Sequence, residues 1–266
     1  MPVISPFRGL RYNPDRISSI SRVVAPPYDV IDSEQEEALR ARHPQNIVHV
    51  TLGKTPQGGR SEDAYNRAAT KLHEMKRENV FVQDDTPSIY VIEQSFRVGN
   101  DWVVRRGFIS ALMLEELGTD SIHPHEHTMS SPKDDRFNLT HHCQTKLSQI
   151  MGVYSDSNGE IDDYVRNMRS GKPTYSFTDD DEVAYRFWHV TDSDMVYGLV
   201  DRMAEEQLVI ADGHHRYESS LSYAQQHRDE EKEWGHAPED YIACLCISVD
   251  NPGLLTLPTH RLLRFN

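Results

Sequence analysis

A buried strand that runs through a glycine turn into a helix is the feature that most constrains the fold of this chain. The apolar residues 208–211 are followed at once by Asp212-Gly213-His214-His215-Arg216, and apolar side chains then recur with a helical period. Backbone amides at the start of such a helix lack partners, and together with the helix dipole they attract anions. The segment therefore predicts an α/β chain with an anion-binding loop, and a phosphate is the ligand we expect.

The side chains of this loop indicate a division of roles. Gly213 lets a ligand approach the backbone closely, Arg216 can make two parallel hydrogen bonds to a phosphate or carboxylate, and His214 adds a donor. We expect these three residues to bind the ligand, and Asp212 and His215 to take part in catalysis. The alternatives are structural, because Asp212 is also a preferred helix N-cap residue and Arg216 can pair with a carboxylate.

A second polar segment covers residues 122–136. Its three histidines at alternate positions, His123, His125 and His127, resemble the spacing of transition-metal ligands. Pro124 argues against a strand there, since it removes a ladder hydrogen bond and favours an edge or a loop. We therefore expect no metal site among these side chains, and a zinc site remains the weaker alternative.

The acidic residue within this segment, Glu126, is expected to act as a general base or to share a Mg²⁺ ion. Three neighbouring side chains are expected to bind phosphate oxygens of the same ligand, namely Thr128, Lys133 and Arg136. The alternative is an ordinary polar loop that contains ion pairs. A third polar group, Thr259, His260 and Arg261, is equally compatible with a cleft or with a surface turn.

Composition excludes several classes of protein. The formal net charge of -14 opposes binding to nucleic acid, whose recognition depends on cationic side chains. Residues 97–106 hold three arginines, which we interpret as a hairpin that needs no ligand. No segment approaches the roughly 18 apolar residues of a membrane span. Three cysteines without a CxxC pair favour a reducing cytoplasm. The oligomeric state stays open.

Periodicity along the chain predicts a mixed sheet with flanking helices. Strands are expected at 47–52, 89–96, 102–114, 150–154, 187–190, 208–211 and 241–249. Helices are expected from Ser33 to Pro44, at 61–77, from after Arg136 to about 148, and at 159–173, 193–206 and 215–228. Gly99-Asn100 suits a tight turn and so predicts an antiparallel hairpin. Cys244 and Cys246 are expected on one buried strand face.

Several multi-residue motifs, in a fixed order, resemble a bacterial and archaeal family known as domain of unknown function 1015. They are residues 24–31, 43–48, 124–128, 132–136, 211–218 and 258–261. The Asp-Gly-His-x-Arg loop is in turn similar to that of ParB/sulfiredoxin-like proteins, which include kinases of free serine. The resemblance implies a ParB-like core at 107–266 with an N-terminal α/β lobe at 1–106. Because family members usually continue further, we expect a C-terminal region to be missing.

The resemblance also implies an activity. Asp212 to Arg216 would hold nucleotide phosphate, from ATP or ADP with Mg²⁺, and Glu126 would serve as the base. We therefore expect a phosphotransferase that acts on a small hydroxyl substrate such as serine. A regulatory module that senses a nucleotide without turnover is the first alternative, and a metal-dependent hydrolase is the second. The common nucleotide-binding and hydrolase motifs GxxxxGK[ST], GxGxxG, GxSxG and HExxH are absent from the sequence.

Overall fold

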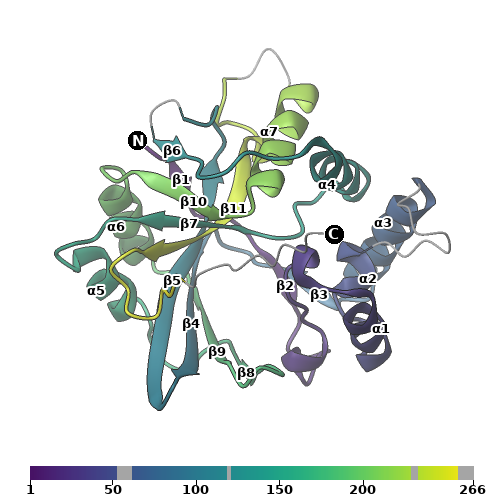
Figure 1. Ribbon diagram of the computed structural model, residues 1–266, viewed down its shortest axis with the longest axis horizontal. Helices are drawn as coiled ribbons and strands as arrows, with labels where there is room; N and C mark the ends of the chain where they lie inside the picture. Colours follow the sequence, from purple (N-terminus) through teal and green to yellow (C-terminus); the bar gives the residue numbers. More distant parts are fainter. Residues whose placement is uncertain (53–61, 119–120, 229–232, 257–266) are drawn as a thin grey trace, which may run out of the picture.

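The computed structural model describes residues 1–52, 62–118, 121–228 and 233–256. A mixed sheet of nine strands runs through the centre of the protein (Figure 1) in the order β6-β10-β7-β11-β5-β4-β9-β8, with β1 paired to β5. The strands are β1 (Ile4–Ser5), β4 (Ile89–Val98), β5 (Asp101–Met113), β6 (Ile122–His123), β7 (Ile150–Tyr154), β8 (Tyr175–Thr178), β9 (Ala184–Val190), β10 (Leu208–Asp212) and β11 (Tyr241–Ser248). The mixed α/β fold predicted from the sequence is confirmed.

Helices flank this sheet. Figure 1 shows α5 (Glu160–Asn167) and α6 (Ser193–Met203) on one side of β7 and β10, and α4 (Ser130–Cys143) and α7 (His214–His227) on the other. The main apolar core includes side chains of β4, β5, β10, β11, α5, α6 and α7, whereas the buried apolar side chains of α4 belong to the cluster of the N-terminal segments. The loop at residues 212–216 therefore starts from a strand whose neighbours are fixed by a large core.

The N-terminal segments form a separate group. Helices α1 (Ser33–Arg42), α2 (Val48–Thr51) and α3 (Glu62–Arg77) lie beside the small sheet of β2 (Leu10–Tyr12) and β3 (Phe81–Gln83). Their apolar cluster also takes in Leu139 and Cys143 of α4, so α4 joins the group to the rest of the chain. The predicted lobe boundary at residue 106 falls inside β5, and the division into lobes stays a prediction.

Most predicted elements are confirmed. Strands β4 and β5 form the antiparallel hairpin, and Gly99 at its tip has a φ of 63°, which suits glycine. β11 lies in the middle of the sheet between β7 and β5, and its Cys244 and Cys246 are fully buried. The helix predicted at 61–77 is α3, and it buries Ala64, Ala68, Leu72 and Met75 on one side. Strand β8 was missed, since its four residues carry only a short alternation.

The strand predicted at 47–52 is wrong, because Val48–Thr51 forms the short helix α2. The cause is the buried side chain of Asn46. Its carbonyl oxygen accepts from the Val48 amide, while its Nδ2 donates to the carbonyls of Arg22 and Val24 at 3.0 Å each. These bonds turn the chain into a helix despite its β-branched residues, which shows tertiary contacts overriding local propensity.

Helix boundaries differ from the predictions by a few residues. Asp32, and not Ser33, caps α1, since its side chain accepts from the Gln35 amide at 2.8 Å. α4 begins well before the expected position and ends at Cys143, and α5 ends at Asn167 instead of near Pro173. Across the described ranges, no helix is both long enough and apolar enough to cross a membrane.

Candidate functional site

The predicted loop lies where β10 meets α7. Gly213 is the N-cap residue with a φ of 93°, and no side chain in the described part of the chain caps the helix, so the N-cap role considered for Asp212 is wrong. A Cβ on Gly213 would also come within 3.0 Å of both the Arg216 guanidinium and Ile150. Backbone conformation and close packing thus both require glycine here. The first amides of α7 are left without a side-chain cap, as an anion site needs.

Arg216 makes its polar contacts within the protein. Its guanidinium pairs with the Asp212 carboxylate and donates to the carbonyl of Gln149, which precedes β7. The side chain of Arg216 is 9% exposed, whereas that of Asp212 is 51% exposed. The ion pair considered as the structural alternative is present, and it holds the loop against the neighbouring strand.

His214 contacts the second polar segment. Its Nε2 accepts from the His125 amide at 3.2 Å, which places the ring proton on Nδ1. Nδ1 lies 3.1 Å from Glu126 Oε1, outside the direction of a hydrogen bond, and has no other partner in the described part of the chain. Burial lowers the pKa of His214, and the opposite effect of Glu126 does not compensate for it, so the ring is neutral at pH 7.

The first turns of α7 and the polar segment at 122–136 meet at three further contacts. His215 Nε2 accepts from the Met129 amide at 3.1 Å. Thr128 and Lys133 both donate to Glu218 Oε2, at 2.7 and 2.8 Å. Burial alone would raise the pKa of Glu218, but the bonds from Lys133 and Thr128 outweigh it and lower that pKa. The structure thus brings together six of the predicted residues, namely Glu126, Thr128, Lys133, Gly213, His214 and His215.

Arg136 lies elsewhere. It pairs with Asp135 at 2.6 Å, donates to the carbonyl of Thr51 and stacks on the ring of Tyr28 at 3.9 Å. Tyr28 belongs to the Pro-Pro-Tyr-Asp segment near the N-terminus. Arg136 therefore ties α4 to the N-terminal segments. Thr259, His260 and Arg261 lie outside the described residues.

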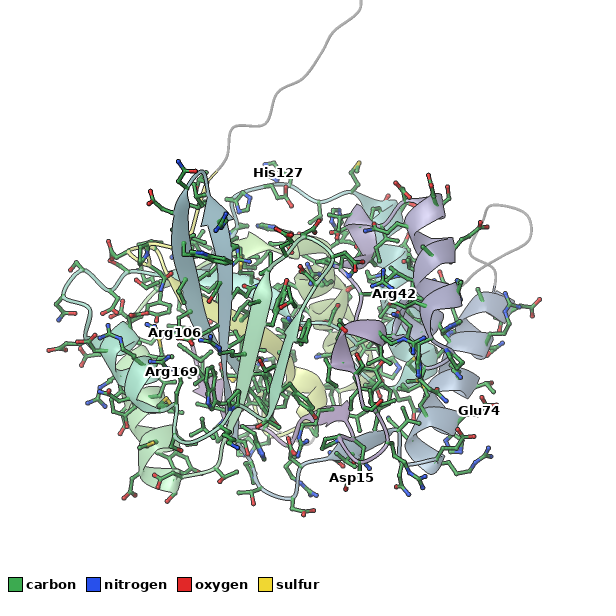
Figure 2. The ribbon with its side chains drawn as sticks, turned by 90° about the horizontal axis from the view of Figure 1, so that it is seen from below. Asp15, Arg42, Glu74, Arg106, His127 and Arg169 are labelled. Carbon is green, nitrogen blue, oxygen red and sulfur yellow. The ribbon has the colours of Figure 1, made fainter. Side chains whose placement is uncertain are left out.

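The histidines do not form the metal set considered from their spacing. His127 is exposed at the surface (Figure 2). One group in the described ranges has the proximity that a metal needs, and it combines His125, Glu126 and His214, whose ligand atoms lie within 4.8 Å of one another. Nδ1 of His125 contacts the Ile210 carbonyl at 2.6 Å, which leaves its Nε2 available.

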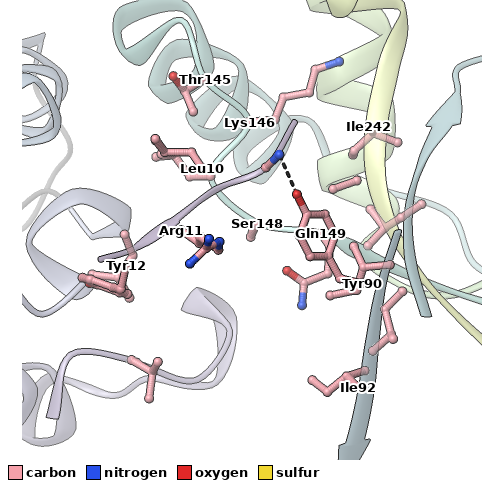
Figure 3. Close-up of a pocket in the computed structure, with 18 of the residues that line it drawn as sticks. Leu10, Arg11, Tyr12, Tyr90, Ile92, Thr145, Lys146, Ser148, Gln149 and Ile242 are labelled. Carbon is pink, nitrogen blue, oxygen red and sulfur yellow. Dashed lines mark hydrogen bonds between the residues drawn. The ribbon is translucent and has the colours of Figure 1, made fainter. Parts of the chain in front are cut away.

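A large cleft opens beside the loop. The described residues enclose about 2020 Å³ between the sheet and the N-terminal segments. Figure 3 shows Arg11 and Tyr12 of β2 on one wall and Tyr90, Gln149 and Ile242 on the other. Asp212 and Arg216 line this cleft, whereas Glu126 and His214 are not among its lining residues. The predicted residues thus occupy two sides of the first turn of α7.

The walls of this cleft are more cationic than the protein as a whole, whose formal net charge is -14. Their cations are Arg8, Arg11, Arg42, Lys76, Arg105, Lys146 and Arg216, and their acids are Asp179, Asp180, Asp181, Asp212 and Glu239. The cleft therefore suits an anionic ligand. Its volume exceeds the roughly 300–1,000 Å³ usual for a small-molecule site.

Lys146 of this cleft is partly buried. Its amine donates to the carbonyls of Glu239, at 2.8 Å, and Tyr241, and burial lowers its pKa to about 7. The unfolded chain, with an ordinary lysine pKa near 10.5, binds a proton that the folded protein releases. The contribution of Lys146 to the free energy of unfolding therefore increases as the pH rises from about 7 toward 10.5.

We expect the free energy of unfolding of the wild type to increase by about 2 kcal/mol between pH 7 and 9 relative to Lys146→Met. Urea unfolding at both pH values measures this difference. Lys172→Met, at an exposed lysine, is the matched control and should follow the wild type. Equal pH dependence in Lys146→Met and the wild type would contradict the assignment of a depressed pKa.

Sequence reasoning missed several residues of the site. Glu218, which binds Thr128 and Lys133, lies four positions after His214, so helical spacing places both on one side of α7. Arg11 and Asp84 were also missed, although they pair at 2.6 Å in the cleft wall. No local pattern could have found that pair, because its members are far apart in the sequence.

The fold and the loop together define a mixed α/β protein with an uncapped helix N-terminus beside a carboxylate–histidine contact. The chain belongs to the family described as "Protein of unknown function (DUF1015)", whose model matches residues 4–266. Searches of the curated proteins and of the solved structures found no match. The family predicted from the motifs is confirmed, and the similarity to ParB/sulfiredoxin-like proteins stays a proposal.

Proposed function

We propose that this chain is a nucleotide-binding enzyme of ParB-like type that transfers a phosphoryl group from ATP to a small hydroxyl substrate such as serine. One observation carries the proposal. The half-exposed carboxylate of Glu126 lies 3.1 Å from His214, in the first turn of a helix whose amides no side chain caps. A base and an anion-binding helix start thus lie side by side. The buried, unpaired thiols of the chain suit a cytoplasmic enzyme.

The residues of this site have separable tasks in the proposed reaction. The substrate hydroxyl oxygen attacks the γ-phosphorus, the bond to the bridging oxygen of ADP breaks, and the hydroxyl proton passes to Glu126. The amides of α7 and the amine of Lys133 neutralise phosphate oxygens. Mg²⁺ would supply further charge neutralisation, and the Glu126 carboxylate is an oxygen donor of the kind that it prefers.

The ion pairs of the site decide which cationic side chains can bind a phosphate. Lys133 pairs with Glu218, at side-chain exposures of 35% and 26%, so its amine can exchange that carboxylate for a phosphate oxygen. Arg216 and Arg136 are buried and held by Asp212 and Asp135. We therefore assign phosphate binding to the α7 amides and Lys133, and a positioning role to Arg216.

Metal-dependent hydrolysis is the second candidate, because His125, Glu126 and His214 lie close enough to hold an ion. The hydrogen bonds oppose it. While His214 Nε2 accepts the His125 amide, its Nδ1 carries the proton and cannot bind a metal. Zinc in stoichiometric amount, found by elemental analysis of the purified protein, would favour this candidate over the first.

Calorimetric titration with ATP, ADP and pyrophosphate tests the proposed function. We expect Lys133→Gln to weaken ATP binding by about 10–100-fold, the equivalent of one charge-assisted hydrogen bond. Lys172→Gln, at an exposed lysine, is the matched control and should bind like the wild type. Failure of all three ligands to bind the wild type would rule the proposal out. Binding without product from any hydroxyl amino acid would indicate the sensing module.

A further inference from the structure

Arg105 of β5 lines the cleft. Cross-strand pairing places it opposite Gln94 of β4, which lies opposite Tyr185 of β9, and Phe177 of β8 completes the row. All four residues line the cleft, so their side chains share one face of the sheet. The row is part of the sheet wall that faces the N-terminal segments.

The charge of Arg105 is not balanced within the described ranges. Its Nε donates to the neutral carbonyl of Gln94 at 2.8 Å, and its guanidinium lies 5.9 Å from the Phe96 ring. No ion pair to it is found there, and the Asp179 carboxylate of this wall accepts instead from the amides of Asp181 and Val183 at 3.0 and 2.9 Å. Burial lowers the pKa of Arg105, yet a guanidinium stays charged at neutral pH.

Arg106 and Arg11, by contrast, are paired. Arg106, the next residue, points to the opposite face and contacts Glu93 at 2.8 Å and Asp162 at 3.0 Å. Arg11, on the facing wall of the cleft, contacts Asp84 at 2.6 Å. A partly buried charge without a partner costs free energy that an incoming anion would recover. Arg105 thus has the features of a residue that binds an anionic ligand.

We propose that Arg105, with Gln94 and Tyr185 beside it, forms a second anion-binding site in the cleft, which takes a carboxylate or phosphate group of a small ligand. The guanidinium supplies two parallel N–H donors to that group. This site goes beyond the proposed phosphoryl transfer and does not rest on it. It also revises the interpretation of residues 97–106 as a hairpin that needs no ligand.

The strand register separates this site from the first turn of α7. Gln149, which accepts from Arg216, directly precedes Ile150, and Ile150 is level with Cys244 and through it with Ser110 of β5. From Ser110 back to Arg105 the strand covers about 17 Å, and β7 lies two strand spacings, about 10 Å, to the side. The two sites are therefore about 20 Å apart along the sheet. A cleft of about 2020 Å³ has room for both.

Titration with malonate and with inorganic phosphate, at constant ionic strength, tests this site on the full chain. We expect at least one of these anions to bind the wild type, and Arg105→Gln to weaken that binding at least tenfold. Arg97→Gln is the matched control, because Arg97 is exposed on the same hairpin and lies outside the cleft lining. Its dissociation constant should stay within twofold of the wild type.

The melting temperature without added anion gives a second measurement. Removal of an unbalanced charge should leave the melting temperature of Arg105→Gln unchanged or higher, whereas removal of a structural arginine should lower it. A response to malonate alone identifies a carboxylate ligand, and a response to phosphate alone identifies a phosphate ligand. The inference is overturned if neither anion shows binding that depends on Arg105. Anion binding that persists while ATP fails to bind would overturn the proposed function alone.

Discussion

Replacing Glu126 with glutamine is expected to slow phosphoryl transfer from ATP to L-serine by about 10²–10⁴-fold, the usual contribution of a general base. Glutamine preserves the size of the side chain but cannot accept the hydroxyl proton. Because the Glu126 side chain is 52% exposed, the substitution should leave the fold intact. Phosphoserine formation under single-turnover conditions measures the effect, and circular dichroism confirms the fold.

Glu74→Gln is the matched control for this experiment. Glu74 is half-buried on α3, away from His127 in Figure 2, and should not affect turnover. ATP affinity is expected to be similar in Glu126→Gln and the wild type, since the phosphates are assigned to α7 and Lys133. Unchanged turnover in Glu126→Gln would remove Glu126 from the mechanism, while a loss of ATP affinity would indicate a role in Mg²⁺ binding.

Glu93→Gln is expected to lower the free energy of unfolding by about 3 kcal/mol, because it leaves two arginines without their shared carboxylate. The Glu93 side chain is 3% exposed and accepts from Arg106 at 2.8 Å and Arg169 at 2.6 Å. Figure 2 shows both arginines on the same side of the molecule. Their exposures of 14% and 24% place the expected loss at the lower end of the range for buried pairs.

Chemical unfolding of the purified variant measures this loss. Asp163→Asn is the matched control, because Asp163 pairs with Arg166 at side-chain exposures of 63% and 48%, where ion pairs contribute less than about 1 kcal/mol. Similar losses in the two variants would contradict the buried network. Glu93 also lies on the sheet face opposite the cleft, so Glu93→Gln should not alter anion binding at Arg105.

Local patterns predicted much of the fold. The hairpin of β4 and β5 follows from its turn residues, and β7, β10 and β11 follow from apolar runs, since these signals lie within each segment. The strand predicted at 47–52 failed because Asn46 bonds to the carbonyls of Arg22 and Val24, which are distant in the sequence. Short strand β8 lies at the end of the strand order beside β9, and its own signal is too weak to detect.

The candidate site, like the fold, could be predicted from the sequence only in part. Sequence alone located the loop at residues 212–216 and the segment around Glu126, because a glycine turn between strand and helix is a local signal. It could not show that these segments meet through His125, His214 and Glu218. Nor could it show that Arg216 is held by Asp212 and Gln149, since a guanidinium offers the same donors to a ligand or to the protein.

By itself, the sequence determined the family, the mixed α/β class and the position of the glycine turn and helix start after β10. Only the tertiary structure decided which charges stay available there. Which cations are paired depends on distances that the fold sets. Arg136 and Arg216 each form an ion pair with a carboxylate, whereas the charge of Arg105 has no ion-pair partner within the described ranges. The sequence therefore indicated where an anion could bind, and the fold decided which cations could receive it.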